Sequence, residues 1–128
     1  MEVGTGWLPA NAHPESKAEL LAWGADVVAS LISDRDHPRV QQANVIEAQA
    51  ASACELKAAK DFPIHPICKG RLHTPADCLQ FGRFVRWAEK ELLAGSKVIV
   101  HCRQGQHRTG VAIYILIRQV KTAADDEI

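Results

Sequence analysis

The segment Lys97–Gly110, KVIVHCRQGQHRTG, decides the fold of this chain, and an apolar-rich segment follows it to about Lys121. Lys97 to Val100 has the composition of a buried strand, and the segment from near Arg108 to Lys121 has that of a helix. A loop that curls over a helix N-terminus directs backbone N–H groups inward and adds the positive end of the helix dipole. The sequence therefore predicts an anion site between this strand and this helix.

The rest of the chain alternates between strand-like and helical segments. In chain order we expect a helix between Ser16 and Gly24, a strand over 25–32, a helix over 41–60, a strand over 62–67 and a helix over 74–95, before the strand over 97–100 and the final helix over 108–121. This alternation predicts an α/β fold: one domain over residues 1–128, with a mostly parallel central sheet flanked by helices in three layers.

The helix over 74–95 has the clearest boundaries. Thr74 is a good N-cap, Pro75 suits the first helical position, and Asp77 falls in the first turn. A core-facing stripe follows at spacings of three and four, consisting of Cys78, Phe81, Val85, Ala88 and Leu92. Cys78, like Cys54, is therefore expected to be a small core side chain.

Composition and charge exclude several classes of function. Lys and Arg total 15 and Asp and Glu total 15, so overall charge gives no reason to expect nucleic-acid or membrane binding. The apolar runs are too short to span a bilayer, and the N-terminal segment lacks the features of a secretory signal. The four irregularly spaced cysteines favour reduced thiols and a cytoplasmic location, and the absence of a CxxC pair predicts no structural zinc. We expect no metal and no cofactor.

The loop itself carries residues suited to nucleophilic chemistry. Cys102 would lie at the bottom of the ring of amides, where the same groups that attract phosphate also stabilise a thiolate. Gly105 allows a tight loop, and Arg108 in the first helical turn can offer a bidentate fork to a phosphate. Thr109 can donate a hydrogen bond to the sulfur, and His101 can brace the loop from the strand side.

The run HCRQGQHRTG resembles the H-C-x5-R-[ST]-G signature of protein tyrosine phosphatases and dual-specificity phosphatases. The resemblance to the small dual-specificity type extends to Trp7-Leu8-Pro9, to 23–31, to Phe62-Pro63-Ile64 and to the helix over 74–95. It implies a dual-specificity-phosphatase-like fold, with few residues after the last helix where the family packs further helices. The chain is therefore expected to be a fragment or a short member.

The same resemblance implies a cysteine-dependent phosphatase that works through a phosphocysteine. Cys102 would be the nucleophile, Arg108 the phosphate binder and Thr109 the hydroxyl that supports the thiolate. The phosphate cradle would consist of Arg103, Gln104, Gly105, Gln106 and His107. The expected partner is a phosphorylated protein, on phosphotyrosine or also on phosphoserine and phosphothreonine, or a phosphorylated small molecule. A phosphoinositide or inositol-phosphate substrate and a non-catalytic phosphate-binding module are alternatives, and the oligomeric state is left open.

The general acid is the point where the chain departs from the family. The family's acid is usually an Asp in the loop after the Phe-Pro-Ile-like strand, and here the loop over 65–73 contains no Asp or Glu. Asp77 is our prediction for this role, although a capping role for it is favoured. Asp34 and Asp36 follow another strand, so they could reach the same sheet edge or be solvated turn residues, and His73 could also act. Asp61 is expected to start a strand, far from that edge.

Cys68 and two other enzyme classes complete the alternatives. Cys68 lies where the acid is expected, so it could pair with Cys102 on oxidation, although inert packing is favoured. Low-molecular-weight arsenate reductases share a Cys-x5-Arg loop, but theirs lies near the N-terminus. Rhodanese-type sulfurtransferases also use a loop cysteine, but the Arg108-Thr109-Gly110 ending fits phosphatases better.

Overall fold

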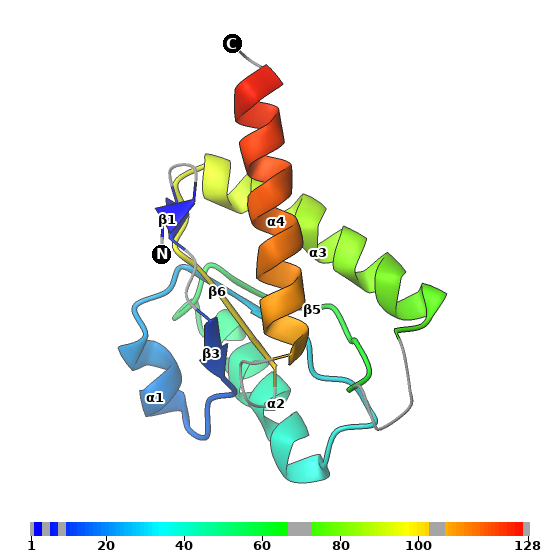
Figure 1. Ribbon diagram of the computed structural model, residues 1–128. Helices are drawn as coiled ribbons and strands as arrows, with labels where there is room; N and C mark the ends of the chain where they lie inside the picture. The colour runs from blue at the N-terminus through cyan, green and yellow to red at the C-terminus, as the bar shows by residue number, and fades with distance from the viewer. Residues whose placement is uncertain (1, 4–5, 8–9, 67–72, 103–106, 127–128) are drawn as a thin grey trace.

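The computed structural model describes residues 2–3, 6–7, 10–66, 73–102 and 107–126 (Figure 1). The helices and strands, in chain order, are β1 (Glu2–Val3), β2 (Gly6–Trp7), β3 (Ala10–Ala12), α1 (Lys17–Ala22), β4 (Val27–Ser30), α2 (Pro38–Ser52), β5 (Ala58–Asp61), α3 (Pro75–Leu93), β6 (Val98–Cys102) and α4 (His107–Asp126). In the described part of the chain, no helix is both long enough and apolar enough to cross a bilayer.

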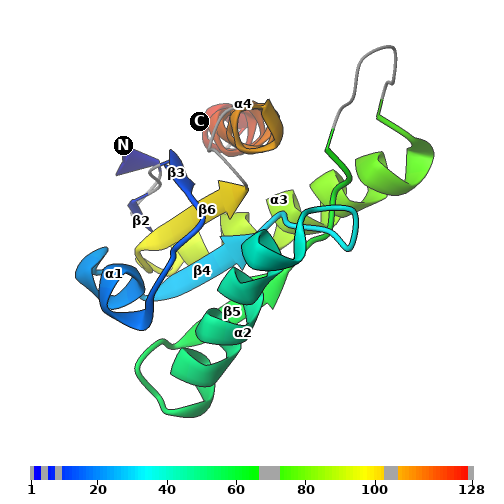
Figure 2. The ribbon, with the colours of Figure 1, turned by 90° about the horizontal axis from the view of Figure 1, so that it is seen from below.

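The central sheet is parallel, with strand order β3-β6-β4-β5, and Figure 2 shows these strands side by side. Ser30 of β4 lies opposite His101 of β6 on one side and Asp61 of β5 on the other. The carboxyl ends of these strands therefore meet at one edge, and in α/β sheets ligands bind beyond that edge. β1 and β2 form a separate antiparallel pair.

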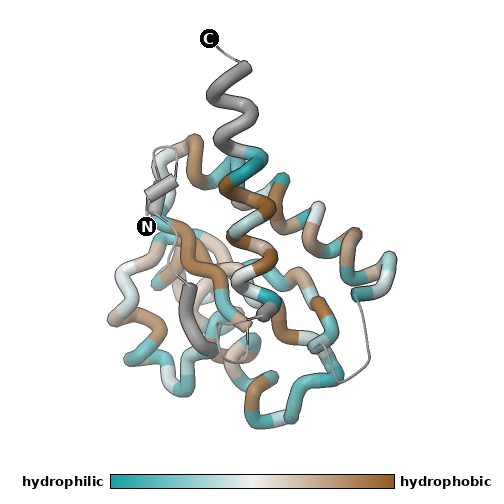
Figure 3. Tube along the Cα trace, viewed as in Figure 1, coloured by the Kyte–Doolittle hydropathy of each residue, from teal (hydrophilic) through white to brown (hydrophobic). Residues whose placement is uncertain are grey.

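Helices cover both faces of this sheet. Val27 and Ala29 of β4 belong to the core that includes Phe81 of α3 and Leu116 of α4. Val28, which points the other way, packs with Leu20 of α1 and with residues of α2. Figure 2 shows the same division, and in Figure 3 the most hydrophobic colour runs along β6 in the interior. The predicted three-layer α/β arrangement is confirmed.

The region between residues 52 and 67 differs from the prediction. The helix expected to reach residue 60 ends at Ser52, and Cys54 adopts a left-handed conformation with φ 59° just after it. The next strand is β5, over Ala58–Asp61, whereas we expected a strand over 62–67. Lys60 and its neighbours lie in register with β4, and tertiary pairing outweighs the helix propensity of alanine here. Pro63 and Pro66 have no N–H to continue the ladder.

The predicted Thr74 cap of α3 is confirmed, and α1 lies between Ser16 and Gly24 as expected. The Thr74 hydroxyl accepts the Asp77 amide at 3.2 Å and the Asp77 carboxylate accepts the Thr74 amide at 3.0 Å, which completes a capping box. Ser16 caps α1 by accepting the amide of Glu19. Gly24 and Gly95 adopt φ of 69° and 86° after their helices, a conformation that glycine accepts without a steric penalty.

The prediction that Cys54 and Cys78 are core side chains is wrong, because both are exposed. Cys54 follows the end of α2, beyond the buried face of that helix. At the start of α3 the inward position belongs to Asp77, whose capping role turns its side chain toward the protein, so Cys78 faces solvent. The remaining predicted members of the α3 stripe are buried.

Candidate functional site

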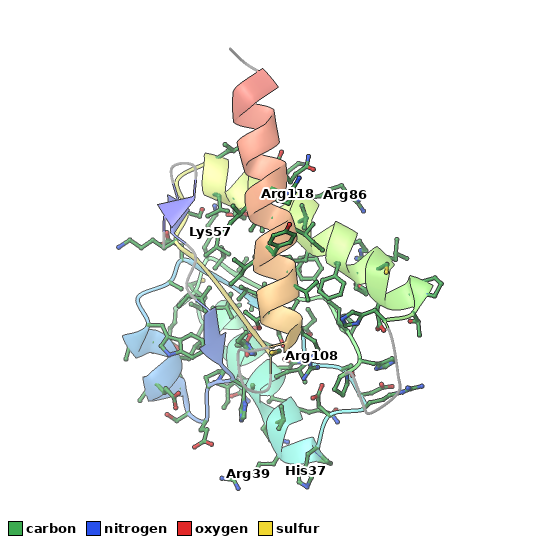
Figure 4. All side chains as sticks on the ribbon, viewed as in Figure 1. His37, Arg39, Lys57, Arg86, Arg108 and Arg118 are labelled. Carbon is green, nitrogen blue, oxygen red and sulfur yellow. The ribbon has the colours of Figure 1, made fainter. Side chains whose placement is uncertain are left out.

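Three of the predicted site residues lie where β6 ends and α4 begins. Cys102 is the last residue of β6 and is buried, and Arg108 and Thr109 are buried in the first turn of α4. Figure 4 shows Arg108 at that end of α4. The predicted cradle residues Arg103, Gln104, Gly105 and Gln106, together with the side chain of His107, lie outside the described residues, as does Cys68.

The Arg108 guanidinium is held in a buried ion pair with Asp36. Nη1 donates to Asp36 Oδ2 at 2.8 Å and Nη2 donates to Oδ1 at 2.9 Å, a bidentate arrangement. Nη1 also donates to the carbonyls of Ile64 at 2.9 Å and Leu31 at 3.3 Å. Asp36 is itself fixed, because the Ser33 amide donates to its Oδ2 at 2.8 Å. Arg108 is therefore oriented by segments that follow β4 and β5.

This arrangement occupies only one edge of the guanidinium. Asp36 takes the Nη1–Nη2 end, and among the described residues no acceptor is recorded for Nε or for the second N–H of Nη2. A guanidinium has five N–H donors in a fixed plane, and these two lie parallel along its side. That side edge matches two oxygens of a phosphate. Asp36 thus orients Arg108 and leaves the Nε–Nη2 edge available.

Asp36 forms an ion pair with Arg108 that the sequence did not reveal. The sequence leaves it as an acid at the sheet edge or a solvated turn residue, but its side chain is 1% exposed and paired with a residue 72 positions away. The only local signal is its position after a buried strand, beside the edge where strands end. Asp34, two residues earlier, has an exposed carboxylate.

Thr109 carries a hydroxyl suited to the predicted role. The residue is fully buried, and its Oγ1 has no hydrogen-bond partner among the described residues. A buried hydroxyl without a partner is unusual, because leaving it unpaired costs about 1–3 kcal/mol. The hydroxyl is thus available to donate to a sulfur anion at the end of the neighbouring strand.

His101 forms a buried hydrogen bond with a carboxylate, on the opposite face of the sheet. Its Nε2 lies 2.9 Å from Glu47 Oε2 of α2, and neither side chain is more than 1% exposed. This contact ties β6 to α2 immediately before Cys102. Glu47 was not singled out from the sequence, because nothing in the helix pattern distinguishes a buried glutamate from an exposed one. The predicted bracing of the loop by His101 concerns residues outside the described part.

Asp61 is placed differently from the prediction. It ends β5 rather than starting a strand, so it lies at the carboxyl edge of the sheet. Partial burial and the Glu47 carboxylate raise the pKa of Asp61, while His101 opposes that shift. These neighbours place Asp61 on the α2 side of the sheet with the His101–Glu47 pair.

Asp77, the predicted general acid, performs the capping role in this structure. One oxygen accepts the Thr74 amide at 3.0 Å and the other accepts the His65 amide at 3.1 Å. Its side chain is 2% exposed, and His73 Nδ1 lies 3.8 Å from it. Asp77 therefore joins the start of α3 to the segment after β5, and its acid role stays a prediction.

A cleft of about 400 Å³ adjoins this region. Its lining residues come from the segments after β4 and β5 and from the first turns of α3: Asp34, Pro63, His65, Ala76, Asp77 and Gln80. The Ile64 carbonyl that accepts from Arg108 lies between two of these residues in sequence. The cleft is therefore close to the candidate phosphate site.

The described residues contain no group of three or more His, Cys, Asp or Glu side chains that could hold a metal ion. Compared with known proteins, the chain matches no protein-family model and no curated protein.

Proposed function

We propose that this protein is a phosphomonoester hydrolase that acts through a phosphocysteine intermediate, with Cys102 as nucleophile and Arg108 as phosphate binder. The observation that carries the proposal is the buried Arg108–Asp36 pair at the start of α4, which leaves the side edge of the guanidinium available beside the end of β6. A buried, oriented arginine next to a strand-end cysteine is the arrangement that phosphate binding and attack on phosphorus require.

In the proposed reaction the Cys102 thiolate attacks phosphorus, the S–P bond forms and the bond to the leaving oxygen breaks. The leaving oxygen takes a proton from a general acid, and water then attacks the phosphocysteine, releasing phosphate and the thiolate. Arg108 stabilises charge on the non-bridging oxygens, and the Thr109 hydroxyl stabilises the sulfur as it leaves. Cys102 ends β6, and Arg108 and Thr109 stand in the first turn of α4, the next described element along the chain.

The proposed substrate is a protein phosphorylated on tyrosine, or also on serine and threonine, in the cytoplasm. This choice, like the dual-specificity-phosphatase-like fold, rests on the sequence resemblance together with the three-layer α/β arrangement. A phosphoinositide or inositol phosphate is the alternative substrate, and it would depend on Arg103 and His107.

A second candidate is a non-catalytic phosphate-binding module. The observation that favours it is the engagement of both Asp77 oxygens by backbone amides, because the predicted acid is then committed to the cap of α3. This module would bind a phosphate ester through Arg108 without cleaving it.

The test is hydrolysis of p-nitrophenyl phosphate by wild type and Cys102→Ser, with Cys54→Ser as the matched control because Cys54 is an exposed thiol outside the site. We expect Cys102→Ser to abolish turnover and Cys54→Ser to leave it unchanged. Tungstate binding, measured by calorimetry, separates the two candidates. Turnover that survives in Cys102→Ser refutes the nucleophile, whereas tungstate binding by an inactive wild type supports the binding module.

A further inference from the structure

The cleft beside the candidate phosphate site contains a histidine that the sequence analysis did not single out. His65 follows Ile64, whose carbonyl accepts from Arg108 Nη1 at 2.9 Å, so its backbone is one peptide away from the guanidinium contact. Its side chain is 29% exposed and lines the cleft together with Asp34 and Asp77. His65 is therefore accessible to a molecule whose phosphate is bound by Arg108.

Contacts on one side of the ring hold His65 in place. Nδ1 lies 2.8 Å from Ser33 Oγ and 3.9 Å from Asp34 Oδ1, and the backbone amide donates to Asp77 Oδ1 at 3.1 Å. Nε2, on the other side of the ring, has no recorded hydrogen bond to any described residue. An imidazole fixed through one nitrogen, with the other available, is the usual arrangement of a histidine that transfers protons.

We propose that His65 is the general acid and base of this site, a proposal that rests on the proposed phosphatase function. In the first step the S–P bond forms, the P–O bond to the leaving group breaks, and the His65 imidazolium gives its Nε2 proton to the leaving oxygen. In the second step the neutral imidazole accepts a proton from the attacking water, the P–S bond breaks, and phosphate, thiolate and imidazolium result.

The other acids and histidines near the cleft have surroundings that suit this role less well. Both oxygens of Asp77 accept backbone amides, and the Asp36 carboxylate is paired with Arg108. Asp34 is 88% exposed and lies on the Nδ1 side of His65, where it can orient the ring. Both ring nitrogens of His73 are buried, and the ring packs edge-on against Phe81 with centroids 5.1 Å apart.

Three charged groups lie near His65, and each can influence how activity at this site depends on pH. Asp34 approaches from the loop after β4, Asp77 from α3 through the backbone amide, and Arg108 from α4 through the Ile64 carbonyl. Because the acid must be protonated in the first step, activity on phenyl phosphate is expected to fall as pH rises and the proton is lost.

The test compares His65→Asn and Asp77→Asn with wild type on p-nitrophenyl phosphate and on phenyl phosphate. Asn can retain the hydrogen bond to Ser33 but cannot transfer a proton, and His37→Asn is the matched control because His37 is an exposed cap of α2. We expect His65→Asn to lower kcat by about 100-fold or more on phenyl phosphate and by less than about 10-fold on p-nitrophenyl phosphate, whose leaving group needs little protonation. The basic limb of the pH profile should disappear in His65→Asn and persist in Asp77→Asn and His37→Asn.

The outcomes separate the two proposals. If wild type and His65→Asn show the same dependence on pH and leaving group, His65 is not the acid, while hydrolysis that needs Cys102 still supports the phosphatase function. Loss of the basic limb in Asp77→Asn alone would transfer the role to Asp77. A wild type inactive on both esters overturns both proposals. Ser33→Ala removes the Oγ contacts to His65 Nδ1 and to the Arg35 amide while leaving the imidazole in place. Urea unfolding of every variant identifies losses of activity that come from destabilised folding, and such losses would also count against the acid role.

Discussion

The Arg108–Asp36 pair offers the sharpest test of how the site is built. Asp36→Ala removes both oxygens that accept from the guanidinium and the acceptor of the Ser33 amide, and it leaves a cation that is 4% exposed without a counter-charge. Removing one partner of a buried ion pair typically costs about 3–5 kcal/mol. A domain of this size has a total unfolding free energy of about 5–15 kcal/mol, so the loss is large. Asp36→Asn keeps one acceptor but carries no charge and turns an NH2 group toward an arginine N–H, so a loss of similar size is expected.

The assay is urea unfolding of Asp36→Ala, Arg108→Met and the double variant. The double variant removes both charges together, so its destabilisation should fall short of the sum of the single variants by at least about 2 kcal/mol. Lys57→Met is the control, because Lys57 forms an ion pair with Glu91 at 3.1 Å while its side chain is 59% exposed, and it should lose less than about 1 kcal/mol. Figure 4 labels Arg108 and Lys57. Additivity within about 0.5 kcal/mol would refute the idea that Asp36 holds Arg108.

Two further predictions concern Thr109 and Asp61. Thr109→Val should leave the unfolding free energy within about 1 kcal/mol of wild type, because the buried hydroxyl has no recorded partner, yet slow hydrolysis of p-nitrophenyl phosphate by about 10-fold or more. Unchanged rates would remove Thr109 from the site. Asp61→Asn should stabilise the protein at pH 7, by less than about 1 kcal/mol because the carboxyl is only partly buried and water still screens it. The raised pKa means that folding favours the protonated carboxyl, a contribution present in full below the ordinary value of 3.8 and lost as pH rises through the folded-state value. The difference between Asp61→Asn and wild type should therefore shrink in acid, and a difference that grows in acid would contradict this reasoning.

The sequence by itself predicted the features that depend on neighbouring residues. The predicted cap of α3 by Thr74 joins groups three positions apart, and the helices expected to end near Gly24 and Gly95 do so because these glycines accept a left-handed conformation. The strand–loop–helix order around Cys102 placed the cysteine and Arg108 at the same end of α4 for the same reason. These interactions are recorded in spacing and residue type, so they can be predicted before the strand order is known.

Only the tertiary structure decided how the site is held together. Asp36 and Arg108 are 72 positions apart, Glu47 and His101 are 54 apart, and Ser33 and His65 are 32 apart. Each pair depends on which strands are neighbours and where each strand ends. The position of β5 was not predicted, because its alanine-rich sequence favours a helix and only pairing with β4 makes it a strand. A carboxylate can act as a general acid, hold a buried arginine or remain solvated in a turn, depending on the groups around it. Those groups come from segments distant in the chain. That is why the proposed nucleophile, Cys102, could be singled out from its own motif while the residues that hold Arg108 could not.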